Sequence, residues 1–236
     1  MRPLALFLGA LSACATTPTP VAAWLPAVCR DGGRFEPEHC AAVLLSDIWG
    51  DPGPLAQDEQ LAAYVTQVGR RVAAQARAPD HDFRFHILET DQLKAQARLG
   101  DNIDVSTAML AQLDSEAELA FILAHEVGHI VSGHTHLDYN DRSANWSTGR
   151  EDISPERLGD RERLADELGL LFAAKASYAS DAAKAFFLRA DQAAQIAGTK
   201  RPAYYPPTPV RVARLERLAA EHAGGQAYAE RYRRAT

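Results

Sequence analysis

The 236-residue sequence lacks a long hydrophobic run beyond its first residues, lacks an excess of basic residues, and contains only three cysteines. No later stretch approaches the ~18 to 20 apolar residues that a membrane-spanning helix needs. The formal net charge is −6, and acids and bases are interspersed, which argues against the basic surface of a nucleic-acid-binding protein. Hydrophobic residues still make up 47% of the chain, enough for one sizeable core. We therefore expect a globular domain with a terminal extension and no nucleic-acid partner.

The amino terminus has the pattern of a short export signal. Arg2 supplies a positive charge, and residues 4–11 are apolar but too few to span a bilayer. Residues 11–14, LSAC, resemble a bacterial lipobox, in which Cys14 is acylated and becomes the new amino terminus. The alternative is an ordinary cleaved signal with an incidental cysteine. The lipobox interpretation predicts a periplasmic protein attached to the membrane only through lipid, and Ala15 points to the outer membrane.

The other two cysteines, Cys29 and Cys40, lie on either side of a turn sequence that contains a glycine pair. An exported protein folds in an oxidising compartment, so we predict a disulfide between them. A metal-binding role of the pair with His39 is the alternative. The predicted organisation is a signal peptide (1–13), a lipidated cysteine and tether (14–23), a disulfide-containing segment (24–57) and the main domain (58–236).

Hydrophobic periodicity predicts a mostly helical α+β domain with a small sheet. In the second of two expected strands, Ile103 and Val105 should face the core and their polar neighbours the solvent. A Ser115–Glu118 capping box should start a central helix. Other helices are expected to start at the N-cap Asp58 and near Pro209, and to cover residues 160–174 and 180–197. Strands are expected over residues 82–89 and 101–107. A long loop is expected over residues 138–160.

The central helix contains HEVGH, from His125 to His129, which has HExxH spacing. Residues four apart share a helix face, so the two imidazoles can bind one ion while Glu126 lies beside them. A histidine-rich surface without chemistry is the alternative, but this apolar helix makes burial of these groups costly without a partner such as zinc. Catalytic zinc takes three protein ligands. The best third ligand is Glu162 in ERLAD, and Asp166 one turn later should accept the other ring N–H of a ligating histidine.

These motifs resemble those of the HtpX-like, BepA-like and prenyl-protease-like zinc metalloendopeptidases, in which HExxH is followed by ExxAD and then a glycine, here Gly169. The similarity continues in KAQARLGDNIDVSTAML and in SYASDA, and covers about residues 60–217. It implies a gluzincin-like zinc metallopeptidase domain with a small β-sheet packed beside the HExxH helix. It also implies one zinc ion per chain, bound by His125, His129 and Glu162, with Glu126 as the catalytic proton acceptor.

The sequence departs from the family pattern at its His-Pro dipeptide. Tyr205 stands in the place of that histidine, followed by Pro206 and, at a matching distance, Arg211. The Tyr205 phenol could stabilise a developing oxyanion, and packing of its ring is the alternative. Arg211 is expected either to pair with an acid near the site or to be an exposed helix charge.

The remaining histidines are assigned no ligand role. His134 and His136 follow the central helix and are expected to be exposed and uncoordinated, with a second metal ion as the alternative. His81 and His86 flank or lie within a strand and show no ligand spacing. In the helix expected over 160–174, which contains ERLAD, the leucines at 164, 168 and 171 should pack inward.

The resemblance also implies how a substrate binds. It places an exposed strand edge beside the zinc helix, on which an extended polypeptide would add as a further strand. This mode favours unfolded or misassembled envelope proteins and a role in quality control. The alternatives are a non-proteolytic chaperone or scaffold lipoprotein for outer-membrane assembly, and a zinc amidase acting on cell-wall peptides. The edge is expected to consist of Asn102, Ile103, Asp104, Val105 and Ser106.

Overall fold

The computed structural model describes residues 54–135, 154–197 and 207–236, all of which belong to one compact unit, Pro52–Thr236. The predicted signal peptide, the lipidation site Cys14 and the disulfide partners Cys29 and Cys40 lie outside the described residues. These assignments therefore stay predictions. Within the described ranges, none of the helices combines the length and the hydrophobicity that crossing a bilayer demands.

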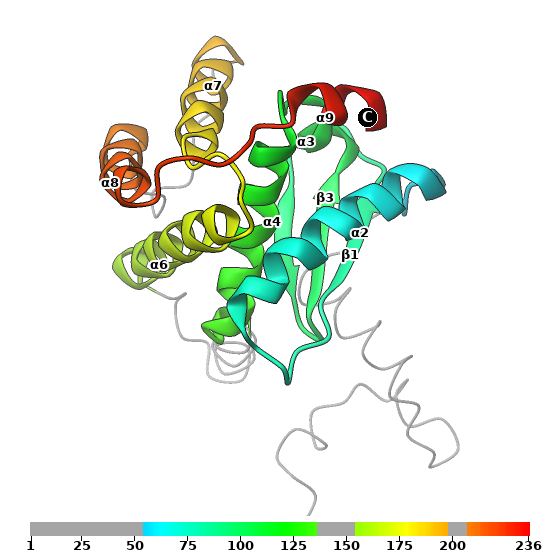
Figure 1. Ribbon diagram of the computed structural model, residues 1–236, viewed down its shortest axis with the longest axis horizontal. Helices are drawn as coiled ribbons and strands as arrows, with labels where there is room; N and C mark the ends of the chain where they lie inside the picture. Colours follow the sequence, from blue (N-terminus) through cyan, green and yellow to red (C-terminus); the bar gives the residue numbers. More distant parts are fainter. Residues whose placement is uncertain (1–53, 136–153, 198–206) are drawn as a thin grey trace, which may run out of the picture. The chain divides into compact units, whose positions relative to one another are not determined.

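Helices dominate the described part of the chain, and three short strands form its sheet (Figure 1). The predicted mostly helical α+β arrangement is confirmed. The elements in chain order are α2 (Glu59–Ala73), the 3-10 turn η3 (Ala74–Ala76), β1 (Arg84–Leu88), β2 (Ala95–Arg98), β3 (Asn102–Ser106), α3 (Thr107–Ala111), α4 (Glu116–Val131), α6 (Pro155–Lys175), α7 (Ala182–Ala197), α8 (Thr208–Glu221) and α9 (Ala229–Ala235).

Side chains cap the helices where the sequence predicts it. The Asp58 carboxylate accepts a hydrogen bond from the Leu61 N–H at 2.9 Å and starts α2. The Ser115 hydroxyl accepts from the Glu118 N–H and starts α4. The Glu118 carboxylate reaches back to the N–H of Asp114, one residue before the cap. These bonds satisfy amide donors that a helix leaves unpaired in its first turn.

The sheet has the order β1-β3-β2, with β3 parallel to β1 and antiparallel to β2. The prediction that Asn102 to Ser106 form an exposed edge is therefore wrong, because β3 is the central strand. Its polar residues do not face solvent either: Asp104 and Ser106 are fully buried. Asp104 accepts hydrogen bonds from Arg98 at 2.6 and 2.8 Å and from Gln96 at 2.8 Å, both on β2. Burial of this acid is tolerated because β2 supplies its partners.

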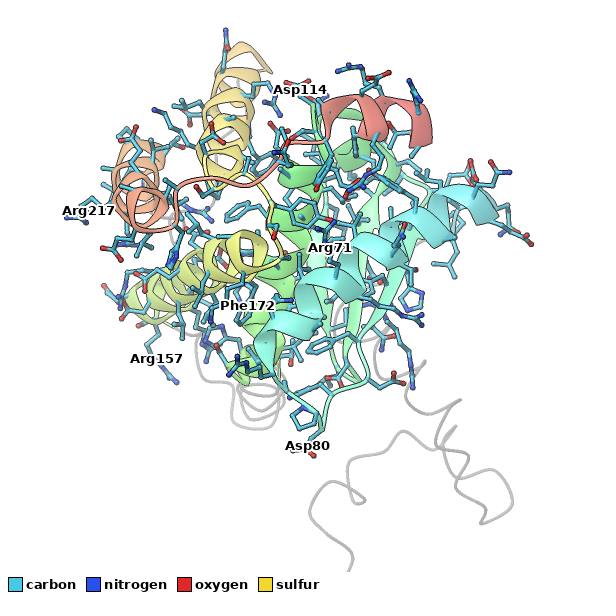
Figure 2. The ribbon with its side chains drawn as sticks, viewed as in Figure 1. Arg71, Asp80, Asp114, Arg157, Phe172 and Arg217 are labelled. Carbon is cyan, nitrogen blue, oxygen red and sulfur yellow. The ribbon has the colours of Figure 1, made fainter. Side chains whose placement is uncertain are left out.

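The helix α4 lies between the sheet and a group formed by α6, α7 and α8 (Figure 1). The helix α2 packs on β1, while α4 packs on β2, and the two helices contact each other. Apolar side chains of these elements form the core, and nearly every residue of α4 is buried. Figure 2 shows Arg217 extending away from α8, whereas Phe172 on α6 is buried. A helix enclosed on both sides positions its side chains rigidly.

The helix α6 differs from its prediction in two ways. It begins at Pro155, with Ser154 as N-cap, so residues 155–160 are helical although the sequence predicts a loop there. Leu164 is 40% exposed and does not pack inward, whereas Leu168 and Leu171 are partly buried and pack against the core as predicted. The face of α6 that meets α4 carries Leu168 together with the small residues Ala165 and Gly169. The short elements β2, α3 and α9 have too few periodic positions to be predicted.

A buried carboxylate ties the start of α4 to three other parts of the fold. Glu116 is 2% exposed and accepts hydrogen bonds from the hydroxyls of Tyr64 at 2.8 Å and Tyr178 at 2.7 Å, and it pairs with Arg231. Burial by itself would raise the pKa of Glu116, but the bonds from Arg231 and the tyrosines outweigh it and lower the pKa. Arg71, labelled in Figure 2, extends from α2, and its Cζ lies 4.8 Å from the centre of the Tyr178 ring.

Replacing this carboxylate should destabilise the domain. We expect Glu116→Ala to lower the free energy of unfolding by about 3 kcal/mol, because it leaves buried hydroxyls without an acceptor. Urea unfolding at pH 7 measures this. Because the folded-state pKa is lowered, the contribution is present above the ordinary value of 4.5 and is lost as the pH falls through the folded pKa. Glu230→Ala removes the exposed pair with Arg234 and should cost no more than about 0.5 kcal/mol. Equal effects of the two changes would contradict this account.

Candidate metal centre

The two histidines of the HExxH motif point at the same place from successive turns of α4. His125 and His129 have side chains only 12% and 14% exposed, and their Nε2 atoms lie 3.1 Å apart. The helix is capped at Ser115, and Leu119 and Leu123, six and two residues before His125, are fully buried. Packing of α4 on both sides therefore fixes the direction of both imidazoles.

Glu162 on α6 completes a group of three possible ligands. Its Oε2 lies 3.6 Å from His125 Nε2, and its Oε1 lies 3.4 Å from His129 Nε2. The three ligand atoms all lie within 4.8 Å of one another. Atoms that bind zinc tetrahedrally at 2.0–2.2 Å lie about 3.3–3.6 Å apart, close to the spacing seen here. Glu162 Oε2 is also buried without a hydrogen-bond partner in the described structure, as an oxygen reserved for a cation would be.

Asp166 lies one turn after Glu162, behind His125. Its Oδ1 is 3.1 Å from His125 Nδ1, the ring nitrogen that faces away from Glu162. Arg211 on α8 donates to both oxygens of Asp166, at 2.7 and 2.5 Å. Burial would raise the pKa of Asp166, but bonds from His125 and Arg211 outweigh it, so the pKa lies below its ordinary value. The acid stays ionised, and it can hold a proton on His125 Nδ1.

Arg211 is therefore not an exposed helix charge. Its side chain is 4% exposed, and its Cζ lies 4.0 Å from the centre of the Phe187 ring on α7. One of its nitrogens is also 3.9 Å from Glu162 Oε2. Of the two alternatives left open by the sequence, pairing with an acid at the site is the one observed. Tyr205, in contrast, lies outside the described residues, so its predicted role stays a prediction.

Glu126 is buried beside the imidazoles, with 7% exposure. Burial raises the pKa of this carboxyl, and the neighbouring His125 and His129 offset only part of the shift. The backbone of Ala97 on β2 forms a hydrogen bond with the carboxyl. A carboxyl with a raised pKa is better matched to proton transfer near neutral pH than an ordinary one. Glu162 differs, because bonds and charges of the histidines and Arg211 outweigh burial and lower its pKa.

His134 is also at the site, and its predicted exposure is wrong. It is 6% exposed, and its Nδ1 lies 3.0 Å from His129 Nδ1. Burial lowers the pKa of His134 to about 4, and the charges of His129 and Arg161 add to this shift. The ring is therefore neutral at pH 7. The glycine at 133, which ends the helical run, is the sequence signal that could have located it. His136 lies outside the described residues.

A cavity of about 390 Å³ opens beside His125. His125, Glu162 and Arg211 form its polar wall, together with Lys94, the residue just before β2. The rest of its lining is apolar and comes from the β2 region, α3, α4 and α7: Leu93, Ala95, Met109, Phe121, Ile122, Phe186, Phe187 and Ala190. A cavity of this composition can accept an apolar side chain next to the candidate metal ligands.

Similarity to known proteins supports this picture. Residues 59–141 match peptidase family M48. Curated relatives are the beta-barrel assembly-enhancing proteases of Yersinia pestis, 36% identical over 81 residues, and of Escherichia coli O157:H7, 29% identical over 92 residues. The first match covers 34% of this chain and 17% of the relative, and the second 39% and 19%. The chain thus matches less than a fifth of each relative's length. The predicted resemblance to these metallopeptidases is confirmed, and a possible His/Glu metal-binding group accompanies it.

Two glycines allow the helices that carry the ligands to approach closely. A Cβ atom at Gly169 on α6 would lie 2.9 Å from the backbone nitrogen of His125, closer than real Cβ contacts. A Cβ atom at Gly128 on α4 would lie 3.2 Å from Leu168 Cβ and 3.3 Å from Ala165 Cα, which is tight but less severe. The Glu162 carboxylate reaches the imidazoles because the two helices lie this close.

A methyl group at Gly169 should push the ligands apart. We expect Gly169→Ala to lower the free energy of unfolding by about 1–3 kcal/mol through overpacking. Zinc affinity, measured by competition with a chelator, should fall as well, because α6 must move away from α4. Gly128→Ala should also lower both the free energy of unfolding and the zinc affinity, but by less. A Gly169→Ala variant that binds zinc as tightly as the wild type would show that the helix separation does not control the site.

Proposed function

We propose that the protein is a zinc-dependent metalloendopeptidase of the bacterial cell envelope, which hydrolyses peptide bonds of unfolded or misassembled proteins. The observation that carries the proposal is the spacing of three ligand atoms from α4 and α6, which suits a tetrahedral ion. His125, His129 and Glu162 would hold one zinc ion per chain. This agrees with the match to peptidase family M48.

The chain's own residues suit each step of peptide hydrolysis. A bound zinc ion would polarise the scissile carbonyl and lower the pKa of a water molecule towards ~7. Glu126 would accept the proton of that water and pass it to the leaving amine, a task for which its raised pKa fits it. Asp166 would hold the proton on His125 Nδ1, so that Nε2 presents its lone pair to the ion.

Substrate would bind along β2, and not along the residues of β3 that the sequence favours. Lys94 O accepts a hydrogen bond from Ser106 N, so the antiparallel alternation turns the backbone groups of Ala95 and Ala97 away from β3. The Ala97 backbone bonds to Glu126, and Ala95 lines the cavity, so this side of β2 faces the site. An extended polypeptide added here would lie beside the HExxH helix. Extended chains are available in unfolded proteins, and this supports the proposed substrate class.

The proposed location is the periplasm, with lipid at Cys14 as anchor to the outer membrane. The export signal and lipobox of the sequence support it, as do the names of the relatives, which refer to β-barrel assembly. A scaffold role without proteolysis remains the competing proposal. It is favoured by one observation, the tyrosine at 205 where the family pattern has histidine.

Removing the proton acceptor should separate catalysis from metal binding. We expect Glu126→Gln to reduce digestion of unfolded casein by about 10²-fold or more, because no carboxylate remains to accept the proton. Elemental analysis should still find one zinc ion per chain. The variants His129→Ala and Glu162→Gln should lose the metal. Glu167→Gln, which lies on α6 like Glu162, should keep it. Digestion by Glu126→Gln at the wild-type rate would refute the mechanism, and a wild-type envelope phenotype of this variant would favour the scaffold.

A proline on the outer edge of β2 should weaken substrate binding alone. Proline lacks an N–H, and the Ala95 N–H does not pair with β3, so Ala95→Pro should leave the sheet intact. We expect KM for an extended peptide to rise by about 10-fold, equivalent to about 1.4 kcal/mol, with zinc content unchanged. Gln96→Pro, which removes a donor that pairs with β3, should instead destabilise the protein. An unchanged KM for Ala95→Pro would exclude strand addition at this edge.

A further inference from the structure

We propose that His134 is a positioning residue for the metal site: its Nδ1 accepts a hydrogen bond from His129 Nδ1–H and so directs the lone pair of His129 Nε2 at the ion. The inference rests on the proposed zinc site and assigns a role to a residue outside both metal motifs. His134 would touch neither the ion nor the substrate. It would act only through His129.

The two nitrogens of the His129 ring face different neighbours. Nε2 lies 3.1 Å from His125 Nε2 and 3.4 Å from the nearer oxygen of Glu162, on the ligand side. Nδ1 lies 3.0 Å from His134 Nδ1, on the opposite side. The two rings are 5.1 Å apart between centres and inclined by 66°. The contact is therefore a directed approach of two nitrogen atoms rather than ring stacking.

Proton counting fixes the direction of this bond. One proton must lie between the two Nδ1 atoms, because two protonated nitrogens would repel and two bare ones would not bond. A ligating nitrogen carries a lone pair, so in neutral His129 the proton is on Nδ1 once Nε2 binds a metal. His134 Nδ1 is then the acceptor, and the single proton of neutral His134 lies on its Nε2.

The chain reverses to bring His134 to this place. On a continuing helix, a residue five positions after His129 would lie about 140° around the axis from it. Instead α4 ends at Val131, and Gly133 adopts a φ of +70°, with its N–H bonded to Ile130 O at 2.9 Å. Glycine adopts this left-handed conformation without the steric penalty of a side chain. This turn places the His134 ring next to the ring of His129.

The imidazoles of His125 and His129 thus face different kinds of hydrogen-bond partner. His125 faces Asp166, an ionised acid whose two oxygens both accept hydrogen bonds from Arg211. His129 faces a neutral imidazole, which accepts a hydrogen bond without adding negative charge to a site that already holds Glu126, Glu162 and Asp166. Within the described residues, the group of possible ligands contains His125, His129 and Glu162 only, so His134 is not a fourth ligand.

Two substitutions of His134 separate hydrogen bonding from packing. His134→Phe keeps a ring of similar size but has no acceptor, whereas His134→Asn can place an oxygen near the position of Nδ1. Zinc affinity, measured by competition with a chromogenic chelator, should fall about 10-fold or more in His134→Phe, in the range typical of lost support for a ligand. His134→Asn should recover most of this loss. Thermal unfolding of the metal-free proteins reports whether each variant folds.

A measurement on the unaltered protein provides a second test. Nitrogen NMR of the zinc-bound chain, labelled at histidine, should find His129 protonated on Nδ1 and His134 protonated on Nε2. The opposite tautomer of His134 would overturn the inference, as would equal zinc affinities of His134→Phe and the wild type. Loss of affinity to the same extent in His134→Phe and His134→Asn would also contradict it, because packing would then be the cause. A wild-type protein that binds no zinc would instead refute the proposed function.

Discussion

The close packing of α4 against α6 is the constraint on which the rest of the site depends. Gly169 lets the backbone of α6 lie against His125, and only at this separation does the Glu162 carboxylate reach both imidazoles. The sheet on one side of α4 and the helices α6 to α8 on the other hold the HExxH helix in place. Packing thus determines ligand geometry, and ligand geometry determines which ion can bind.

Burial of so many ionisable groups would be unfavourable without compensation. Arg211 compensates Asp166 directly, through two hydrogen bonds. Glu162 has only a more distant contact with Arg211, and its Oε2 has no hydrogen-bond partner within the described residues. The negative charge of Glu162 is therefore the least compensated, and a divalent cation bound at its Oε2 would supply the missing partner. Glu126, whose pKa is raised by burial, is close enough to both imidazoles and to the Ala97 backbone on β2 for each of them to offset part of that shift.

Much of the site could be predicted because its signals are local. HExxH places His125 and His129 on one face of any helix, and the capping serine and buried leucines showed that the helix forms. Glu162 and Asp166 were found by motif, and both lie where expected. The order of the strands was not predictable, because β2 has only four residues without alternation and pairs through contacts distant in sequence. His134 was missed because the reversal at Gly133 places it off the helical register.

The central claim is that two imidazoles of α4 and one carboxylate of α6 bind a single zinc ion. Diffraction from zinc-loaded crystals at the absorption edge of the metal tests it most directly. The account predicts one strong anomalous peak about 2.0–2.2 Å from His125 Nε2, His129 Nε2 and an oxygen of Glu162. A peak bound elsewhere, or a Glu162 carboxylate turned to solvent in the loaded protein, would contradict it.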